Sequence, residues 1–194
     1  MHPARTLKSA TFDAHRDLER HPLVKKLGEA ALDRFEYGLC LQGFERFHMG
    51  WELMISQHAM LRAPELPPPM AHAALIRADL DQLKPTLNRA APVPLAFDWC
   101  ATPGDIAGVL YVVEGSNLGN AVLAKRLKPL GYPLAFFTEA GRVAGTRWPR
   151  VQAWLNAELT QTQTLRRAVS SARNTFHLMM ALFDRMAQPE QEIL

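Results

Sequence analysis

A histidine near the start of the chain has the neighbours expected of a metal ligand. Four residues at spacings of three, four and three share one helix face: Lys8, Thr11, His15 and Leu18. Glu19 lies one turn beyond His15, where its carboxylate can accept the Nδ1 proton and leave Nε2 free to bind a metal. A lone histidine on a helix is more often an ordinary surface or core residue, so a second feature must decide between these interpretations.

A second segment, Tyr111–Gly119, has the composition of an apolar helix but contains Gly115 and Gly119, four residues apart. Each glycine in a helix interior costs about 1 kcal/mol relative to alanine. Because glycine has no Cβ, two on one stripe allow a broad, flat object to lie against the helix backbone. The object can be another helix or a planar ligand, and the spacing leaves both open.

Both segments resemble the heme oxygenase family. The pattern L-K-x-x-T-x-x-x-H-x-x-L-E is similar to the family's proximal helix, and E-G-S-N-L-G is similar to the bacterial form of its distal helix. Their occurrence together, in this order, is more specific than either motif alone. The resemblance implies an all-α, single-domain helical bundle that holds heme b between these two helices, with His15 as the iron ligand.

The resemblance also assigns roles to the distal segment. It implies that Gly115 and Gly119 let the helix backbone sit close over the heme and bend there, with helix packing as the alternative. Ser116, Asn117 and Asn120 would order water without acting as strong acids. Some relatives carry an aspartate where Ser116 stands, so the residue that holds the distal water is left open.

Heme degradation requires that activated oxygen attack the porphyrin ring, whereas a strong distal acid–base pair would promote cleavage of the O–O bond. Between Ile106 and Leu123 the only ionisable residues are Tyr111 and Glu114, which fits ring attack. Arg77 resembles the arginine that anchors the distal water network in bacterial relatives. A solvated surface arginine is the alternative for that position.

Further residues are assigned to heme binding by the same resemblance. Lys8 can reach the heme propionates by charge and Tyr111 by a hydrogen bond, the alternatives being a surface lysine and a core tyrosine. Phe176 resembles the aromatic residue of the last helix that lines the pocket, and a plain core residue is its alternative. Thr11 and Glu19 complete the set on the His15 side.

The resemblance implies that O2 and electrons convert heme, both substrate and cofactor, to biliverdin, CO and iron. The sequence has no flavin or dinucleotide motif, so an external donor, a ferredoxin or a reductase, is expected. Lys8 and Tyr111 resemble the anchors of α-cleaving relatives and favour biliverdin IXα. A bilin-accepting phytochrome is a candidate partner, and iron acquisition the other use. The alternatives are a non-catalytic heme-binding or heme-storage protein on this fold and a helical interaction module without heme.

Composition narrows the class of protein. The length of 194 residues predicts one domain, residues 1–194, with a substantial core. The net charge of +3 is mild and the basic residues are scattered, so nucleic acid is not expected, whereas a ligand with two carboxylates is suited. Apolar runs fall short of the ~20 residues that span a bilayer, and no membrane association is expected. Cys40 and Cys100 fit reduced thiols in a cytoplasmic protein.

Helical periodicity dominates the chain, and no strand is expected. Thr102-Pro103-Gly104-Asp105 has a good helix cap, a proline at the first helical position and an acidic residue at the third. His48, His58, His72 and His177 lack a ligand-type pattern and are interpreted as structural or surface residues. Helices are predicted over residues 4–20, 22–30, 32–62, 71–84 (ended by Pro85), 103 to about 128, 147–160 and 163–187, with a loop over 132–146.

Overall fold

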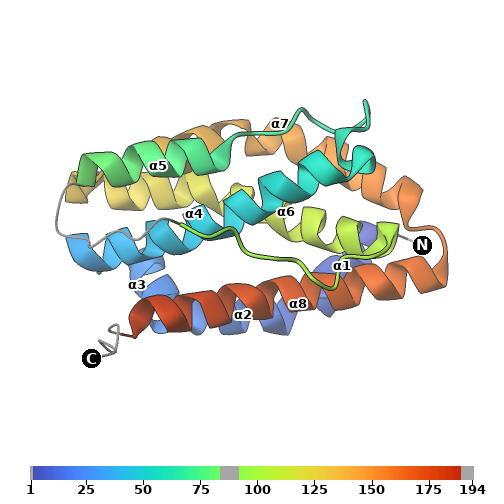
Figure 1. The fold of residues 1–194 in the computed structure, drawn as a ribbon, viewed down its shortest axis with the longest axis horizontal. Coiled ribbons are helices and arrows are strands. Elements are labelled where there is room, and N and C mark those ends of the chain that lie inside the picture. Colours follow the sequence, from blue (N-terminus) through green and yellow to red (C-terminus); the bar gives the residue numbers. More distant parts are fainter. Residues whose placement is uncertain (1, 84–91, 189–194) are drawn as a thin grey trace.

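The computed structural model describes residues 2–83 and 92–188, and every regular element in these ranges is helical, which confirms the predicted all-α class. The elements are α1 (Pro3–Ala10), α2 (Phe12–Arg20), α3 (Pro22–Glu29), α4 (Arg34–Gln57), α5 (His72–Leu83), α6 (Pro103–Leu127), α7 (Ala135–Glu158), α8 (Thr162–Ala187) and the 3₁₀ turns Ala59–Arg62 and Lys128–Leu130. In Figure 1, α5 and α7 form the upper layer, α4 and α6 the middle, and α8 with the N-terminal helices the lower. The central helix α6 packs against both α7 and α8.

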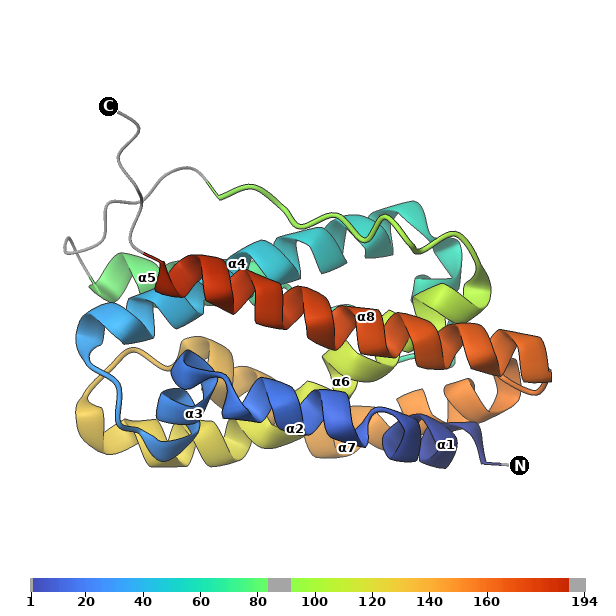
Figure 2. The ribbon, with the colours of Figure 1, turned by 90° about the horizontal axis from the view of Figure 1, so that it is seen from below.

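The three short N-terminal helices lie in a row along the last helix. Figure 2 shows α1, α2 and α3 following one another along α8, and each of them contacts it. Near the ends of this row, α1 and α3 also contact α6. The histidine-bearing helix α2 is therefore held beside α8, between two helices that touch α6.

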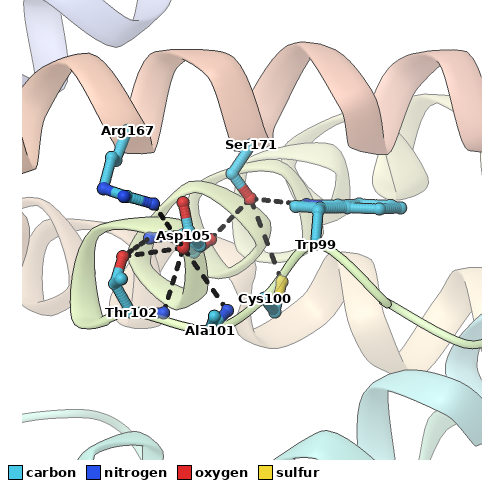
Figure 3. A network of polar contacts seen from close by, with 7 residues as sticks. All are labelled: Trp99, Cys100, Ala101, Thr102, Asp105, Arg167 and Ser171. Atoms are coloured by element: carbon cyan, nitrogen blue, oxygen red, sulfur yellow. Dashed lines mark hydrogen bonds and ion pairs between the residues drawn. The ribbon is translucent and has the colours of Figure 1, made fainter.

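The start of α6 is fixed by the predicted cap and by a polar network that reaches α8 (Figure 3). Asp105 accepts the Thr102 backbone N–H at 3.0 Å, and the Thr102 hydroxyl accepts the Asp105 N–H at 3.4 Å. Ser171 donates its hydroxyl to the Asp105 carbonyl at 2.6 Å and accepts the Trp99 indole N–H at 2.8 Å. Arg167 pairs with the Asp105 carboxylate at 3.5 Å. The first turn of α6 is thus anchored to α8.

Close packing in this half of α6 depends on glycines that the sequence interpretation did not single out. A Cβ on Gly108 would lie 2.3 Å from the Ala168 carbonyl oxygen, and one on Gly104 would lie 2.6 Å from that of Thr164. No real side chain tolerates such a contact with a backbone atom, so only glycine fits at either position. These are the glycines that α6 uses to pack against another helix.

The helix predicted over residues 4–20 is in fact two helices. Thr11 separates α1 from α2, with φ −104° and ψ 1°. Its buried hydroxyl donates to the Leu7 carbonyl at 2.8 Å, a local bond of the kind that competes with regular helix geometry. Lys8 and His15 consequently belong to different helices.

The loop predicted over residues 132–146 is wrong, because α7 begins at Ala135. The Asp79 carboxylate of α5 accepts the N–H of Ala135 at 2.8 Å and that of Phe136 at 2.9 Å, which satisfies the first turn of α7. A Cβ on Gly141 would lie 2.4 Å from a backbone nitrogen of α6, so this glycine serves helix packing rather than a turn. Both contacts are tertiary and have no local sequence signal.

The remaining boundaries are close to prediction. The helix expected over residues 32–62 ends at Gln57 and gives way to the 3₁₀ turn Ala59–Arg62. Helix α5 matches the prediction for 71–84, although Pro85 lies outside the described residues. The glycine-bearing helix and the last helix are confirmed, and the helix expected over 147–160 is the second half of α7.

Two further predictions concern apolar length and cysteine. In the described part of the chain, one stretch, Pro103–Leu130, is long and apolar enough to cross a membrane, and 56% of its most apolar window is buried, as in the core helix of a globular fold. Cys40 and Cys100 are both free thiols, as expected. Burial raises the pKa of Cys40 to about 12 and that of Cys100 to about 11, so neither is a reactive thiolate at neutral pH.

Candidate functional site

His15 projects from α2 beside the last helix. Its ring lies edge-on to that of Phe176, with centroids 5.5 Å apart and planes at 76°. The Glu19 carboxylate lies 3.5 Å from His15 Nδ1, at the spacing the sequence suggested. The His15 side chain is 55% exposed, and Glu19 is its ion-pair partner among the described residues. Nε2 is therefore left for a ligand.

One stripe of α6 contains five residues, of which four are apolar or glycine: Tyr111, Gly115, Leu118, Gly119 and Val122. Its second half is open, because Leu118 is 45% and Val122 50% exposed. A Cβ on Gly119 would meet nothing within 4 Å, and one on Gly115 would meet only a tryptophan ring at ordinary distance. The helix-packing alternative thus fails for Gly119 within the described structure, and the stripe has the character of a binding surface.

The open stripe lies between two contacts, here called ties, that join α6 to the N-terminal helices. At one tie, the Tyr111 hydroxyl lies close to the Thr11 side chain, and burial raises the pKa of this tyrosine. At the other, the Arg126 guanidinium donates to the Gly28 carbonyl at 2.7 Å. Between these ties α6 presents the open stripe, and no residue of α2 is fully buried. This interval between α2 and α6 is the candidate site.

The polar residues that follow Gly115 divide between solvent and core. Ser116 is exposed and donates its hydroxyl to the Val113 carbonyl at 2.8 Å. Asn117 is buried and accepts the Asn120 amide at 3.2 Å, while its own Nδ2 has no partner. A buried donor without a partner is a group that an ordered water satisfies. Asn117 therefore has the free hydrogen-bonding capacity that holding water requires.

Two basic residues assigned by resemblance differ in their surroundings. Arg77 is half-exposed on α5, donates to the Glu45 carboxylate at 2.9 Å, and lies 3.7 Å from the Met49 sulfur, both on α4. Its role in a distal network stays a prediction. Lys8 is exposed at the end of α1 and has no ion-pair partner in residues 2–83 and 92–188, so its charge is free to meet an anionic ligand.

A buried ion pair that sequence analysis missed stands next to Gly115. The Arg147 guanidinium of α7 forms a bidentate pair with Glu114 and donates its Nε to the carboxylate at 3.0 Å. The two side chains are only 9% and 6% exposed. Arg147 also donates to the Pro68 carbonyl at 2.6 Å. Glu114 had been noted only as an ionisable group, and no local pattern connects it to an arginine 33 residues away.

Two buried histidines lie near this pair. The His48 and His72 ring centroids are 4.6 Å apart, and three of their nitrogens lack a hydrogen-bond partner. Burial, with a smaller contribution from Arg147, lowers the pKa of His72 to about 4, and burial also lowers that of His48 well below its usual value. Both rings are neutral at pH 7 and belong to the core. A cavity of about 10 Å³, roughly the room for one water, is lined by His72, Glu114 and Arg147 among others.

Known proteins share both the sequence pattern and the fold. A curated heme oxygenase of Xanthomonas campestris is 27% identical over 159 residues, which cover 79% of this chain and 92% of that protein. The heme oxygenase of Leptospira interrogans superposes with a TM-score of 0.76 at 17% identity, over 95% of this chain and all of that chain. Heme oxygenase-1 of Synechocystis, solved in complex with heme, gives a TM-score of 0.75 at 16% identity, over 96% and 93% of the two chains.

These structural relatives are too distant in sequence to show more than a shared fold. The sequence match is more decisive, since the family model for heme oxygenase aligns with residues 1–185. Nearly the whole chain, including α2, α6 and all but the last two residues of α8, lies inside that match. The expectation of an enzyme of this type, made from two short motifs, is thereby confirmed, and the chain belongs to the heme oxygenase family.

Proposed function

We propose that this protein degrades heme, of the b type, with O2 and electrons from a separate donor, to biliverdin, CO and iron. The observation that carries the proposal is His15, which stands half-exposed with Nδ1 at 3.5 Å from Glu19 and its ring against Phe176. A carboxylate on Nδ1 fixes the tautomer that presents Nε2 to a metal. The relative from Synechocystis was solved with heme bound.

The residues of the interval between α2 and α6 fit a flat, apolar ligand with acidic edges. Leu118 and Val122 offer apolar contact, and Gly119 leaves the backbone open to a planar ring. Lys8 offers an unpaired cation for a propionate. When bound, heme supplies the iron that binds and activates O2. His15 would hold that iron, and the α6 stripe would support the opposite face of the ring.

The polar groups of the distal segment favour ring oxidation over O–O cleavage. In this segment the carboxylate of Glu114 is committed to Arg147 and is turned into the core, so it is not a free acid. Asn117 retains an unpartnered N–H and can hold a water. Along this segment α6 therefore offers neutral donors rather than a strong acid–base pair, with Asn117 on the same core-facing side of the helix as Glu114.

The rival function is heme binding without turnover, and one experiment separates the two. Hemin is titrated into the purified protein, and ascorbate is then added in air. Loss of the Soret band with the appearance of biliverdin absorption supports degradation. A Soret band that forms and persists under reduction indicates a binding protein, and no Soret shift at all would refute both functions.

We further propose that the main product is biliverdin IXα. Lys8 is an exposed cation three residues before Thr11, where it can fix the propionates and hence the rotation of the porphyrin in its plane. A double substitution, Lys8→Ala with Tyr111→Phe, should give mixed isomers on chromatography. A wild-type β or δ product, or an unchanged ratio in the double variant, would contradict the assignment.

Further proposals concern the domain, the location and the partners of the protein. We propose that the chain works as one domain over residues 1–194 in the cytoplasm and takes electrons from a ferredoxin or a reductase. The bilin would pass to a phytochrome, or the released iron would enter metabolism. Turnover assays with each donor, and measurement of bilin transfer to an apo-phytochrome, test these partners.

A further inference from the structure

We infer that Trp148 of α7 is the end wall of the substrate-binding stripe on α6 and sets how far heme can move along that helix. The inference rests on the proposed function, because it concerns where the same ligand stops. It adds a positioning residue that no sequence motif indicated.

Trp148 covers the first half of the stripe and ends where the open half begins. Its ring centroid lies 5.7 Å from that of Tyr111, with planes tilted at 56°. The far edge of its six-membered ring, Cη2, is 3.5 Å from the place where a Cβ of Gly115 would be. One turn further on, Gly119 has nothing within 4 Å. The indole edge is therefore the boundary between covered and open helix surface.

The backbone that carries this ring is held by the neighbours of Trp148 in the chain. Arg147, the preceding residue, is held by Glu114 and by the Pro68 carbonyl. Pro149, the following residue, has a restricted φ and lies inside α7. Glu114 is itself adjacent to Gly115, so one buried ion pair joins α7 to α6 at the residues next to Trp148 and Gly115. The indole ring and the stripe are thus carried by helix segments that this ion pair connects.

A flat ring that lies on Leu118, Gly119 and Val122 meets the indole edge at Gly115. Its apolar rim can pack against the aromatic ring, as tryptophan does in core contacts. Trp148 would then limit translation of heme toward Tyr111, while Lys8 limits its rotation. Removal of the Trp148 ring should weaken heme binding and broaden the ratio of biliverdin isomers. A smaller aromatic ring should preserve the binding and the isomer ratio.

The direct test uses the intact protein with its tryptophans replaced by 5-fluorotryptophan. The chain has four tryptophans, and ¹⁹F NMR with Trp148→Phe as the assignment control identifies the signal of interest. Addition of hemin should shift or broaden the Trp148 signal more than those of Trp51, Trp99 and Trp154. If the Soret band shows that hemin binds but the Trp148 signal is unchanged, the inference is wrong and the proposed function survives. If no Soret band forms, the proposed function itself fails.

Variants test the consequence for binding and product. Trp148→Ala should increase the rate of hemin loss to apomyoglobin about tenfold and broaden the biliverdin isomer ratio, while Trp148→Phe should stay within about twofold of wild type in both. A purely structural role would lower the unfolding free energy of the apoprotein without changing either measurement. Where Trp148→Ala does not fold, Trp148→Leu serves, since it fills volume without an aromatic wall. Wild-type hemin loss and isomer ratio in the non-aromatic variant would overturn the inference.

Discussion

Gly108 and Gly119 lie about three turns apart on α6, yet their surroundings are opposite. A Cβ on Gly108 would strike the Ala168 carbonyl oxygen at 2.3 Å, whereas one on Gly119 would meet nothing within 4 Å. The first glycine lets α6 approach α8, and the second leaves α6 open where no described helix approaches. One helix thus uses glycine to pack against protein and, in our proposal, to receive a ligand.

This contrast predicts stability changes of opposite sign. Gly119→Ala should raise the free energy of unfolding by up to about 1 kcal/mol, because alanine favours the helix and the site is open. Gly108→Ala should lower it by about 1–3 kcal/mol, since the methyl group has no room. Urea unfolding of the two apoproteins measures both. A loss of stability in Gly119→Ala would mean that the open surface is not open in solution.

The size of the side chain at residue 119 should separate helix stability from ligand binding. Gly119→Leu should keep the helix gain of the alanine variant but weaken hemin binding at least tenfold, because its side chain occupies the open stripe. Gly119→Ala is the matched control for helicity. Both variants are titrated with hemin. Wild-type affinity for hemin in the leucine variant would contradict the placement of heme on α6.

Removal of one partner of the Glu114–Arg147 pair should lower the free energy of unfolding more than removal of both. Arg147→Met leaves a buried carboxylate without its partner and should lower the free energy of unfolding by about 3–5 kcal/mol. Glu114→Leu combined with Arg147→Met removes both charges and should recover most of that loss. Chemical denaturation of the single and double variants gives the coupling directly. Equal stability of the two variants would show that the pair is not buried as described.

Stability should depend on pH through the buried histidines. The pKa of His72 is lowered by burial to about 4 from an ordinary 6.5, so the unfolded chain binds its proton first as the pH falls. His72 therefore contributes stability that is complete above pH 6.5 and decreases toward pH 4, by up to about 3 kcal/mol. Denaturation of wild type and His72→Leu across this range should show a smaller slope in the variant. The exposed His177→Leu is the control, and an equal slope in all three proteins would refute the assignment.

The elements that the sequence predicted well are those with local signals. Thr102, Pro103 and Asp105 mark the start of α6 within four residues, and the structure has the cap they indicate. The start of α7 had no such signal, because Asp79, 56 residues earlier in the chain, supplies the cap for Ala135. The break at Thr11 was missed for a subtler reason. The hydroxyl bond to Leu7 is compatible with either a continuous or a broken helix until the tertiary contacts of α1 and α2 are known.

The residues of the candidate site likewise divide into those that the sequence predicted and those that it did not. The spacing of His15 and Glu19 anticipated a contact within one helix, and the structure shows it at 3.5 Å. The apolar stripe was readable in part, since Leu118 and Val122 fall on the face of the two glycines at helical spacing. Arg147 and Trp148 could not be predicted from the sequence, because each contacts α6 from another helix. Sequence reasoning reached the residues that act through helical periodicity and missed those brought in by packing.

The central claim is that His15 binds the iron of a heme that this protein degrades. Its most direct test is hemin titration of wild type and His15→Ala, followed by ascorbate in air. Wild type should give a Soret spectrum with imidazole character and then lose it to biliverdin. His15→Ala should fold, since one exposed side chain is removed and alanine favours the helix, but should lose the imidazole character and the turnover, with exogenous imidazole restoring both. An unchanged ferric spectrum in His15→Ala would assign the ligand elsewhere and contradict the account.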